Sequence, residues 1–251
     1  MPVWRPVLVV GEDAPVNDHT TPPISAPVPA PALRPVRGIA RLAVTSLALA
    51  GGVWAVRAVW EIRLAVTGEP ASGPPDQGEG VHRPLTSLEN SYHLVSTVGG
   101  VAVLICAIVF LLWLDNVRDN ARTLSGHKPR YSGFWLFAGW LIPIANLWIP
   151  RGIVADAHQD SAPGERLPAS LNVWWGLWLI GLLSGAGLMY GDDTDQLIAR
   201  AYTDPWMLFA SDAAVIGAAA AGILVVRAVT AVQERHLDGT VPYGDSPVPT
   251  A

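Results

Sequence analysis

The chain has 251 residues, of which 51% are hydrophobic and only 15% are charged, against about 25% charged residues in a typical soluble domain. This composition points to a lipid bilayer as the solvent and excludes an ordinary soluble domain. The net charge of −5 argues against a nucleic-acid-binding protein, which needs a clustered basic face, and the single cysteine excludes a disulfide within the chain.

The two ends of the chain are predicted to be disordered tails that flank a helical membrane domain. Residues 1–36 contain nine prolines, a composition that favours an extended, solvated segment. Residues 237–251 have the same character. Residues 37–236 are therefore predicted to form the membrane domain.

Four runs in this domain are long and apolar enough to cross a bilayer as helices, which takes about 20 residues. The last run begins well, since Asp204 can cap a helix and Pro205 suits the first helical position. The expected fold class is an all-α, polytopic helix bundle with four transmembrane helices. The four predicted spans are residues 39–60, 92–114, 171–190 and 205–226.

A fifth apolar stretch, residues 134–150, is short for a crossing and carries its own helix breaker. Pro143 removes a backbone donor in the middle of the stretch, and Asn146 follows about one turn later. Irregular backbone at membrane depth survives only when it is buried in protein or faces water. We therefore expect a re-entrant or interfacial Trp/Pro element that packs against the bundle; a short, kinked fifth span is the alternative.

The distribution of Lys and Arg helps to decide between these topologies, because short cytoplasmic loops are enriched in both. If residues 134–150 do not cross, eleven of these basic residues lie inside and three outside; if they cross, the counts are eight and six. The first topology fits the rule better. It places both termini and the segment 115–170 in the cytoplasm.

The sequence before and after residue 130 resembles a known family. "LLWLDNVRDNARTL" is followed by "YSGFWLFAGWLIPIANLWIP", a Trp-rich run with a Pro-Ile-Ala-Asn-Leu-Trp-Ile-Pro core. This arrangement is similar to the actinobacterial membrane family called domain of unknown function 4328. The resemblance implies a multi-pass domain in the plasma membrane of a bacterial cell and no established activity. The residues that carry it are Trp113, Arg118, Asn120, Trp140, Pro143, Asn146, Leu147 and Pro150.

Charged residues inside the predicted spans are candidates for a buried site. Asp212 lies roughly 10 Å along the last span, and a carboxylate at such a depth usually faces the bundle interior or water. Arg57 and His93 lie in the same outer half, so Arg57, His93 and Asp212 can form a polar cluster. This cluster is interpreted either as a proton or ligand site open to the outside or as a structural ion pair. Glu61 competes as a partner of Arg57, one turn away.

A second set of charges lies on the predicted cytoplasmic side. Arg118 and Arg122 follow the second span, and Asp156 and Asp160 stand four residues apart with His158 between them. Their spacing matches no specific metal-ligand motif, so no metal site is predicted. We expect ion pairs between the two arginines and the two aspartates.

Small residues four positions apart are predicted to form helix contacts. Gly181 and Gly185 give the third span a G-x-x-x-G pattern, and Ala218 and Gly222 form a similar pair in the fourth. These faces serve either packing within one bundle or a dimer interface. Tryptophans near the span ends are assigned to the aromatic belt at the membrane–water interface, namely Trp60, Trp113, Trp174, Trp175 and Trp206.

The sequence contains no P-loop, no G-x-S-x-G, no H-E-x-x-H and no C-x-x-C motif. We therefore expect a non-enzymatic integral membrane protein without a cofactor, which acts as a membrane-embedded partner-binding or scaffold domain. Its expected partners are the bilayer and a membrane or cytoplasmic protein, with a homo-oligomer as a further option and no nucleic acid. The alternative is a small solute or ion transporter or channel that uses Pro143, Asn146 and Asp212. A membrane enzyme ranks third.

Overall fold

The computed structural model describes residues 33–77, 79, 81–184 and 194–240. These residues form an all-α structure, as predicted. The predicted tails, residues 1–36 and 237–251, fall almost wholly outside them. The described elements are α1 Arg37–Thr67, α2 Ser87–Ser125, α3 Gly133–Leu141, the 3₁₀ turn η1 Ala145–Leu147, α4 Ile149–Ser161, α5 Ala169–Ser184, α7 Thr194–Thr203 and α8 Pro205–Thr240.

Among the described helices, α1, α2 and α8 are long and apolar enough to cross a membrane. Helix α5, with 16 residues, is also apolar, and residues 185–190 of the predicted span 171–190 lie outside the described part of the chain. At a rise of about 1.5 Å per residue, α2 is roughly 58 Å long and α8 roughly 54 Å. Both exceed the hydrocarbon core of a bilayer, which is about 30 Å thick.

Helix α8 continues to Thr240, past the predicted domain end at residue 236. The extension has a physical reason, because Leu237, just past that end, still packs against the apolar core. The helix thus runs without a break from the membrane domain into the segment predicted to be a tail.

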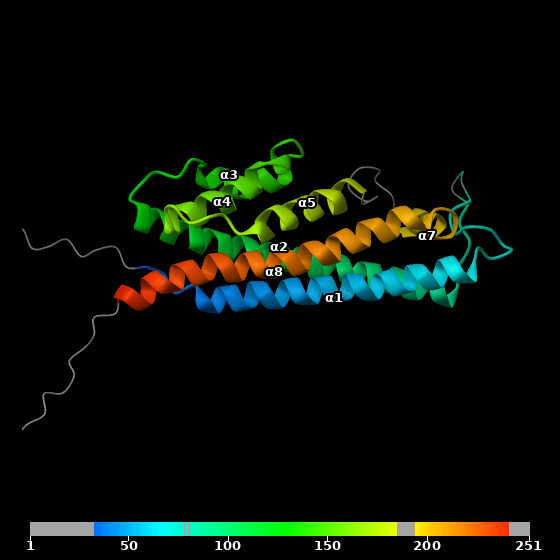
Figure 1. Cartoon of the computed structure of the whole chain (residues 1–251). Coiled ribbons are helices and arrows are strands. Elements are labelled where there is room, and N and C mark those ends of the chain that lie inside the picture. The colour runs from blue at the N-terminus through cyan, green and yellow to red at the C-terminus, as the bar shows by residue number, and fades with distance from the viewer. Residues whose placement is uncertain (1–32, 78, 80, 185–193, 241–251) are drawn as a thin grey trace, which may run out of the picture. The chain divides into compact units, whose positions relative to one another are not determined.

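The long helices pack side by side: α8 lies along α1 and α5, and α1 lies along α2 (Figure 1). Glycine permits one of these close approaches. A Cβ added to Gly51 of α1 meets the Cβ of Ala219 of α8 at 3.0 Å.

The start of α1 and the last turns of α2 and α8 meet at one end of the bundle, which we call the basal end. Arg37 forms an ion pair with Glu234 at 2.8 Å, and Arg34 forms one with Asp119 at 3.0 Å. The other end, which we call the apical end, carries residues 68–86 and α7. There the side chain of Ile198 is fully buried in an apolar cluster that joins α7 to the three long helices.

The segment α3–η1–α4 begins and ends at the basal end (Figure 1). Just before α3, the carbonyl of Tyr131 accepts a hydrogen bond from Arg118 of α2. At the end of α4, the hydroxyl of Ser161 accepts one from Gln233 of α8 at 3.0 Å, and the Ser161 carbonyl lies 2.7 Å from a ring nitrogen of His236. Helix α3 therefore runs into the bundle and α4 returns to the end at which the segment started.

An aromatic cluster fills the space between this hairpin and the bundle. The Trp140 ring of α3 contacts Phe110 of α2 and Trp178 of α5, each at a centroid distance of 5.8 Å. Three tryptophans that the sequence analysis assigned to the aromatic belt are buried instead. The hairpin covers the helix faces on which they lie, so these faces are internal. The three tryptophans are Trp113, Trp174 and Trp175.

Candidate functional site

The break in the hairpin is built around Pro143 and Asn146. Pro143 has no N–H to donate to a carbonyl one turn earlier, and α3 ends at Leu141. The Asn146 side chain, which is 5% exposed, donates instead to the Trp140 carbonyl at 3.2 Å. Asn146 thus supplies a donor where the helical pattern of backbone donors is lost.

Several carbonyl oxygens at the break accept protein donors. Besides the Trp140 carbonyl, the Leu147 carbonyl accepts the indole N–H of Trp175 from α5 at 3.3 Å. Pro150 lies in the first turn of α4, where a missing N–H costs nothing. Two side-chain atoms at the break, Asn146 Oδ1 and Trp140 Nε1, are buried without a partner.

The outer surface of the hairpin is apolar. Phe134, Leu141 and Ile144 expose 66%, 81% and 68% of their surface, and Trp148 exposes 53%. A face of this kind is stable against hydrocarbon and unfavourable in water. It fits an element that lies at membrane depth.

Asn120 of the family motif, on α2, binds the backbone of the segment that precedes α1. Its side-chain amide exchanges two hydrogen bonds of 2.8 Å with the backbone of Arg34, and it donates to Gln233 at 3.2 Å. Gln233 in turn donates to the Val117 carbonyl at 2.7 Å. About two turns before Asn120 on α2, Trp113 donates its indole N–H to Thr230 of α8 at 3.1 Å. These motif residues hold α2, α8 and the segment before α1 in register.

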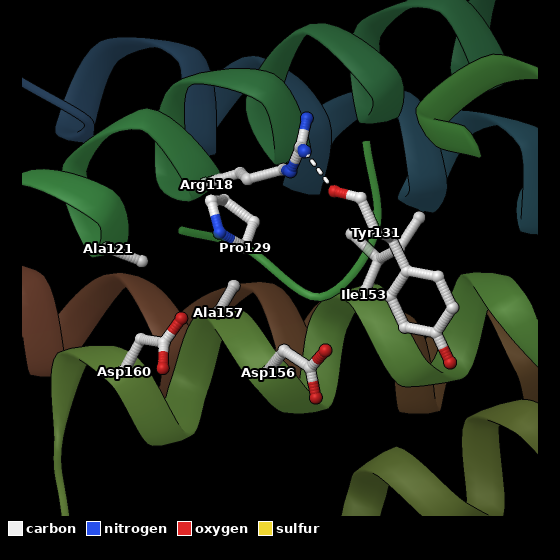
Figure 2. A pocket seen from close by; sticks show the side chains of 8 residues that line it. All are labelled: Arg118, Ala121, Pro129, Tyr131, Ile153, Asp156, Ala157 and Asp160. Atoms are coloured by element: carbon white, nitrogen blue, oxygen red, sulfur yellow. Dashed lines mark hydrogen bonds between the residues drawn. The ribbon is translucent and has the colours of Figure 1, made fainter. Parts of the chain in front are cut away.

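The structure brings Arg118, Asp156 and Asp160 around one small basal pocket (Figure 2). In the described part of the chain, no ion pair within 4.0 Å joins Arg118 or Arg122 to either aspartate. The expected pairing does not form because Arg118 donates to the Tyr131 carbonyl instead, which anchors the start of the hairpin.

Burial perturbs two groups on this side of α4. It raises the pKa of the Asp156 carboxyl, an effect that Arg130 partly offsets, and one oxygen of Asp156 is buried without a partner. Burial also lowers the pKa of His158, which is 3% exposed. The neutral imidazole is therefore the favoured form of His158 at neutral pH. No group of three potential metal ligands occurs among the residues that the structure describes.

The second candidate site is a buried charge cluster near the apical end. One guanidinium nitrogen of Arg57 lies 2.7 Å from an oxygen of Asp212, and another lies 2.8 Å from an oxygen of Glu61. Tyr92 accepts from Arg57 at 3.0 Å and donates to Glu61 at 2.9 Å. The carboxylates and the tyrosine are fully buried, and Arg57 is 7% exposed. The ring of Trp54 covers the guanidinium at 5.1 Å.

The structure thus joins Arg57 to Asp212, but His93 is not part of the cluster. His93 is exposed, and its neighbour Tyr92 takes the internal position. Adjacent helical residues point about 100° apart, so a shift by one residue exchanges an internal side chain for an external one. Glu61, expected only as a competitor of Asp212, is a full member. Its spacing of four from Arg57 was the available signal.

A separate ion cluster closes the apical end. Glu89 is fully buried at the start of α2 and accepts two hydrogen bonds from Arg83, at 2.6 and 2.8 Å. It also accepts the backbone N–H of Thr86, as in a capping box, and the hydroxyl of Tyr202 from α7. Burial next to this carboxylate raises the pKa of Tyr202. The cluster ties α7 and residues 83–86 to α2.

The predicted packing residues lie largely at contacts between helices. A Cβ on Gly181 of α5 meets Val215 of α8 at 2.9 Å, and one on Gly222 meets the Trp174 ring at 3.2 Å. Ala218, which lies between Val215 and Gly222 on α8, is also buried. Gly185 lies outside the described residues.

No curated protein and no solved structure matches the chain. The family model for Domain of unknown function (DUF4328) matches residues 87–231, more than half of the chain. The match begins with α2 and includes the hairpin with its Pro143–Asn146 break, so the resemblance found in the sequence is confirmed. The chain therefore belongs to the family with a domain of unknown function, DUF4328.

Proposed function

We propose that the chain is an integral membrane protein with four spans, α1, α2, α5 and α8, and with both termini in the cytoplasm. The contacts of Tyr131 and Ser161 at the basal end support it, because a segment that starts and finishes at the same end makes no crossing. The excess of Lys and Arg on the proposed inner side supports the orientation.

We propose that the basal end is a docking face for a cytoplasmic protein segment with a basic side chain. The observation that carries this proposal is the pocket between α2 and α4, where Asp156 and Asp160 have no ion-pair partner within the described residues (Figure 2). Arg118 lines the same pocket but donates to the Tyr131 carbonyl and forms no direct ion pair with either aspartate. An incoming Lys or Arg supplies the missing charge.

Cross-linking in cells that express the protein naturally tests this function. A photo-reactive amino acid at Lys128, next to Pro129 in the pocket wall, should give a discrete adduct with a protein partner. Asp160→Asn should reduce the adduct roughly fivefold, since an exposed ion pair contributes about 1 kcal/mol. Asp238→Asn, an exposed change at the same end, should leave it unaltered. Equal adducts in both variants would contradict the proposal.

Transport through the helix break has less support. The carbonyls of Trp140 and Leu147, which a permeating ion would need, already accept protein donors. The buried cluster around Arg57 contains ionisable groups that could bind a proton or an ion. Its role does not depend on the docking face.

A further inference from the structure

The cluster around Arg57 is unbalanced in charge. It contains one guanidinium and the two carboxyl groups of Glu61 and Asp212, all within 8% exposure. With both carboxyl groups ionised, the cluster has a net charge of −1 in an interior that does not solvate charge. An uncompensated buried charge of this kind is strongly destabilising.

The hydrogen bonds of the cluster leave a place for one proton. Arg57 and Tyr92 together serve one oxygen of Glu61, and Arg57 serves one oxygen of Asp212. The second oxygen of each carboxyl group, Glu61 Oε2 and Asp212 Oδ2, is buried and has no partner. The two carboxyl groups lie against the same guanidinium, Asp212 at 2.7 Å from one of its nitrogens and Glu61 at 2.8 Å from another. The two free oxygens lack a donor, and neither Arg57 nor Tyr92 supplies it.

We propose that Glu61 and Asp212 share one bound proton, so that the membrane domain of this protein contains a proton-binding site. The proton gives the cluster a net charge of zero and provides the donor that the two free oxygens lack. Its release leaves an ionised carboxyl pair facing one guanidinium. The site can therefore couple the protonation state of the bundle to the packing of α1 against α8.

Several helices contribute titratable groups near the pair. Helix α1 contributes Arg57 and Glu61, and α8 contributes Asp212. Helix α2 contributes Tyr92, with Glu89 one turn further, which is already held by Arg83. The titratable group of α7 in this region is Tyr202, which donates to Glu89. The described part of α5 offers Ser184 and the Gly181 carbonyl but no titratable side chain. Among the described residues, Arg57 is the cation that contacts Glu61 and Asp212 within 4.0 Å.

An apolar cluster lies on the apical side of the site. It contains Leu64, Ile198 and Leu208 together with Tyr92, and Ile198 belongs to α7. Arg83 and Glu89 form their ion pair at the apical end.

Infrared spectroscopy of the purified full-length protein in lipid nanodiscs tests the proposal. An Asp156→Asn background removes a carboxyl group outside the spans whose pKa burial raises. At pH 7 this protein should give the C=O stretching band of one protonated carboxylic acid, and the band should shift in heavy water. Glu61→Gln and Asp212→Asn should each abolish the band completely, because the remaining carboxylate then pairs with Arg57. Glu69→Gln, an exposed apical change, should leave it intact.

Several outcomes would overturn the assignment. Absence of the band in the Asp156→Asn protein would exclude the bound proton, even if neither site variant folds. Loss of only half of the band in each variant would indicate two independent acids. Absence of the band together with stabilisation by sodium ions would assign the pair to a monovalent metal cation instead.

Discussion

At the scale of single residues, two asparagines on α2 show that the same side chain contributes differently to stability at different positions. Asn120 is 2% exposed and makes hydrogen bonds to Arg34 and Gln233. Asn116 lies one turn earlier and donates to the Leu112 carbonyl of its own helix. The first joins three segments of the chain, whereas the second serves only the helix on which it lies.

Asn120→Ala should therefore destabilise the protein much more than Asn116→Ala. The first change leaves the N–H and C=O groups of Arg34 and the Gln233 oxygen without their partner, at a cost of about 1–3 kcal/mol. The second should stay within about 0.5 kcal/mol. Thermal unfolding followed by tryptophan fluorescence in detergent measures both. Equal shifts of the melting temperature would contradict the fastening role of Asn120.

Single residues of the site could be predicted from the sequence where a charged side chain lies in an otherwise apolar run. Arg57 and Asp212 stand out because they are charged residues in apolar runs, and the structure does bring them together. Tyr92 does not stand out, since a tyrosine near a span end is common. The sequence analysis therefore placed the neighbouring His93 in the cluster instead. The choice between adjacent residues depends on the rotation of α2, which local sequence does not encode.

At the scale of elements, glycines determine how closely the helices can approach. Gly181 of α5 faces α8, and an added Cβ there lies 2.9 Å from a methyl group of Val215. Gly176 on the same helix has nothing within 4 Å of such a Cβ. Valine is stiff at its first side-chain torsion, so it cannot readily move aside.

Gly181→Ala and Gly176→Ala should have opposite effects on stability. The first forces α5 away from α8 and should cost about 1–3 kcal/mol, as overpacking typically does. The second should be neutral or stabilise by up to about 1 kcal/mol, since alanine favours the helix over glycine. Thermal unfolding of both proteins in the same detergent provides the comparison. A destabilising Gly176→Ala would show that the exposed face of α5 meets something else.

The elements themselves were predicted unevenly. The break at Pro143 follows from one covalent fact, the missing N–H, and α3 does end at Leu141. The burial of Trp174 and Trp175 was missed, because an aromatic residue near a span end is equally compatible with lipid headgroups and with an internal surface. That internal surface exists only after the hairpin folds against α5, which is a tertiary effect.

At the scale of the whole molecule, the two ends of the bundle differ in their buried polar groups. The basal end buries the amides of Asn120 and Gln233, and its ion pairs, such as Arg37–Glu234, are more exposed. The apical half buries the carboxylates of Glu61, Glu89 and Asp212. The proposed orientation places the buried amides on the cytoplasmic side and the buried carboxylates on the outer side.

Labelling single cysteines in intact cells tests this orientation on a Cys106→Ser background. An impermeant maleimide should label Ser72→Cys and Thr203→Cys, both exposed and apical, and should not label Arg166→Cys until the membrane is opened. If the hairpin instead crossed the membrane, Arg166→Cys would be labelled and Thr203→Cys protected. Ser161 is unsuitable as a probe because it is 1% exposed and bonded to Gln233.

The hydrogen bond from Trp175 to the Leu147 carbonyl has a consequence for biosynthesis. The hairpin is synthesised before α5, and until Trp175 emerges this carbonyl has no protein donor at membrane depth. An unsatisfied carbonyl in hydrocarbon is costly, so the hairpin must wait near the aqueous surface or beside the insertion machinery. The hairpin should therefore insert late, after α5 has been synthesised. A nascent chain that stops before residue 175 should leave the Trp-rich segment accessible to proteases and chaperones.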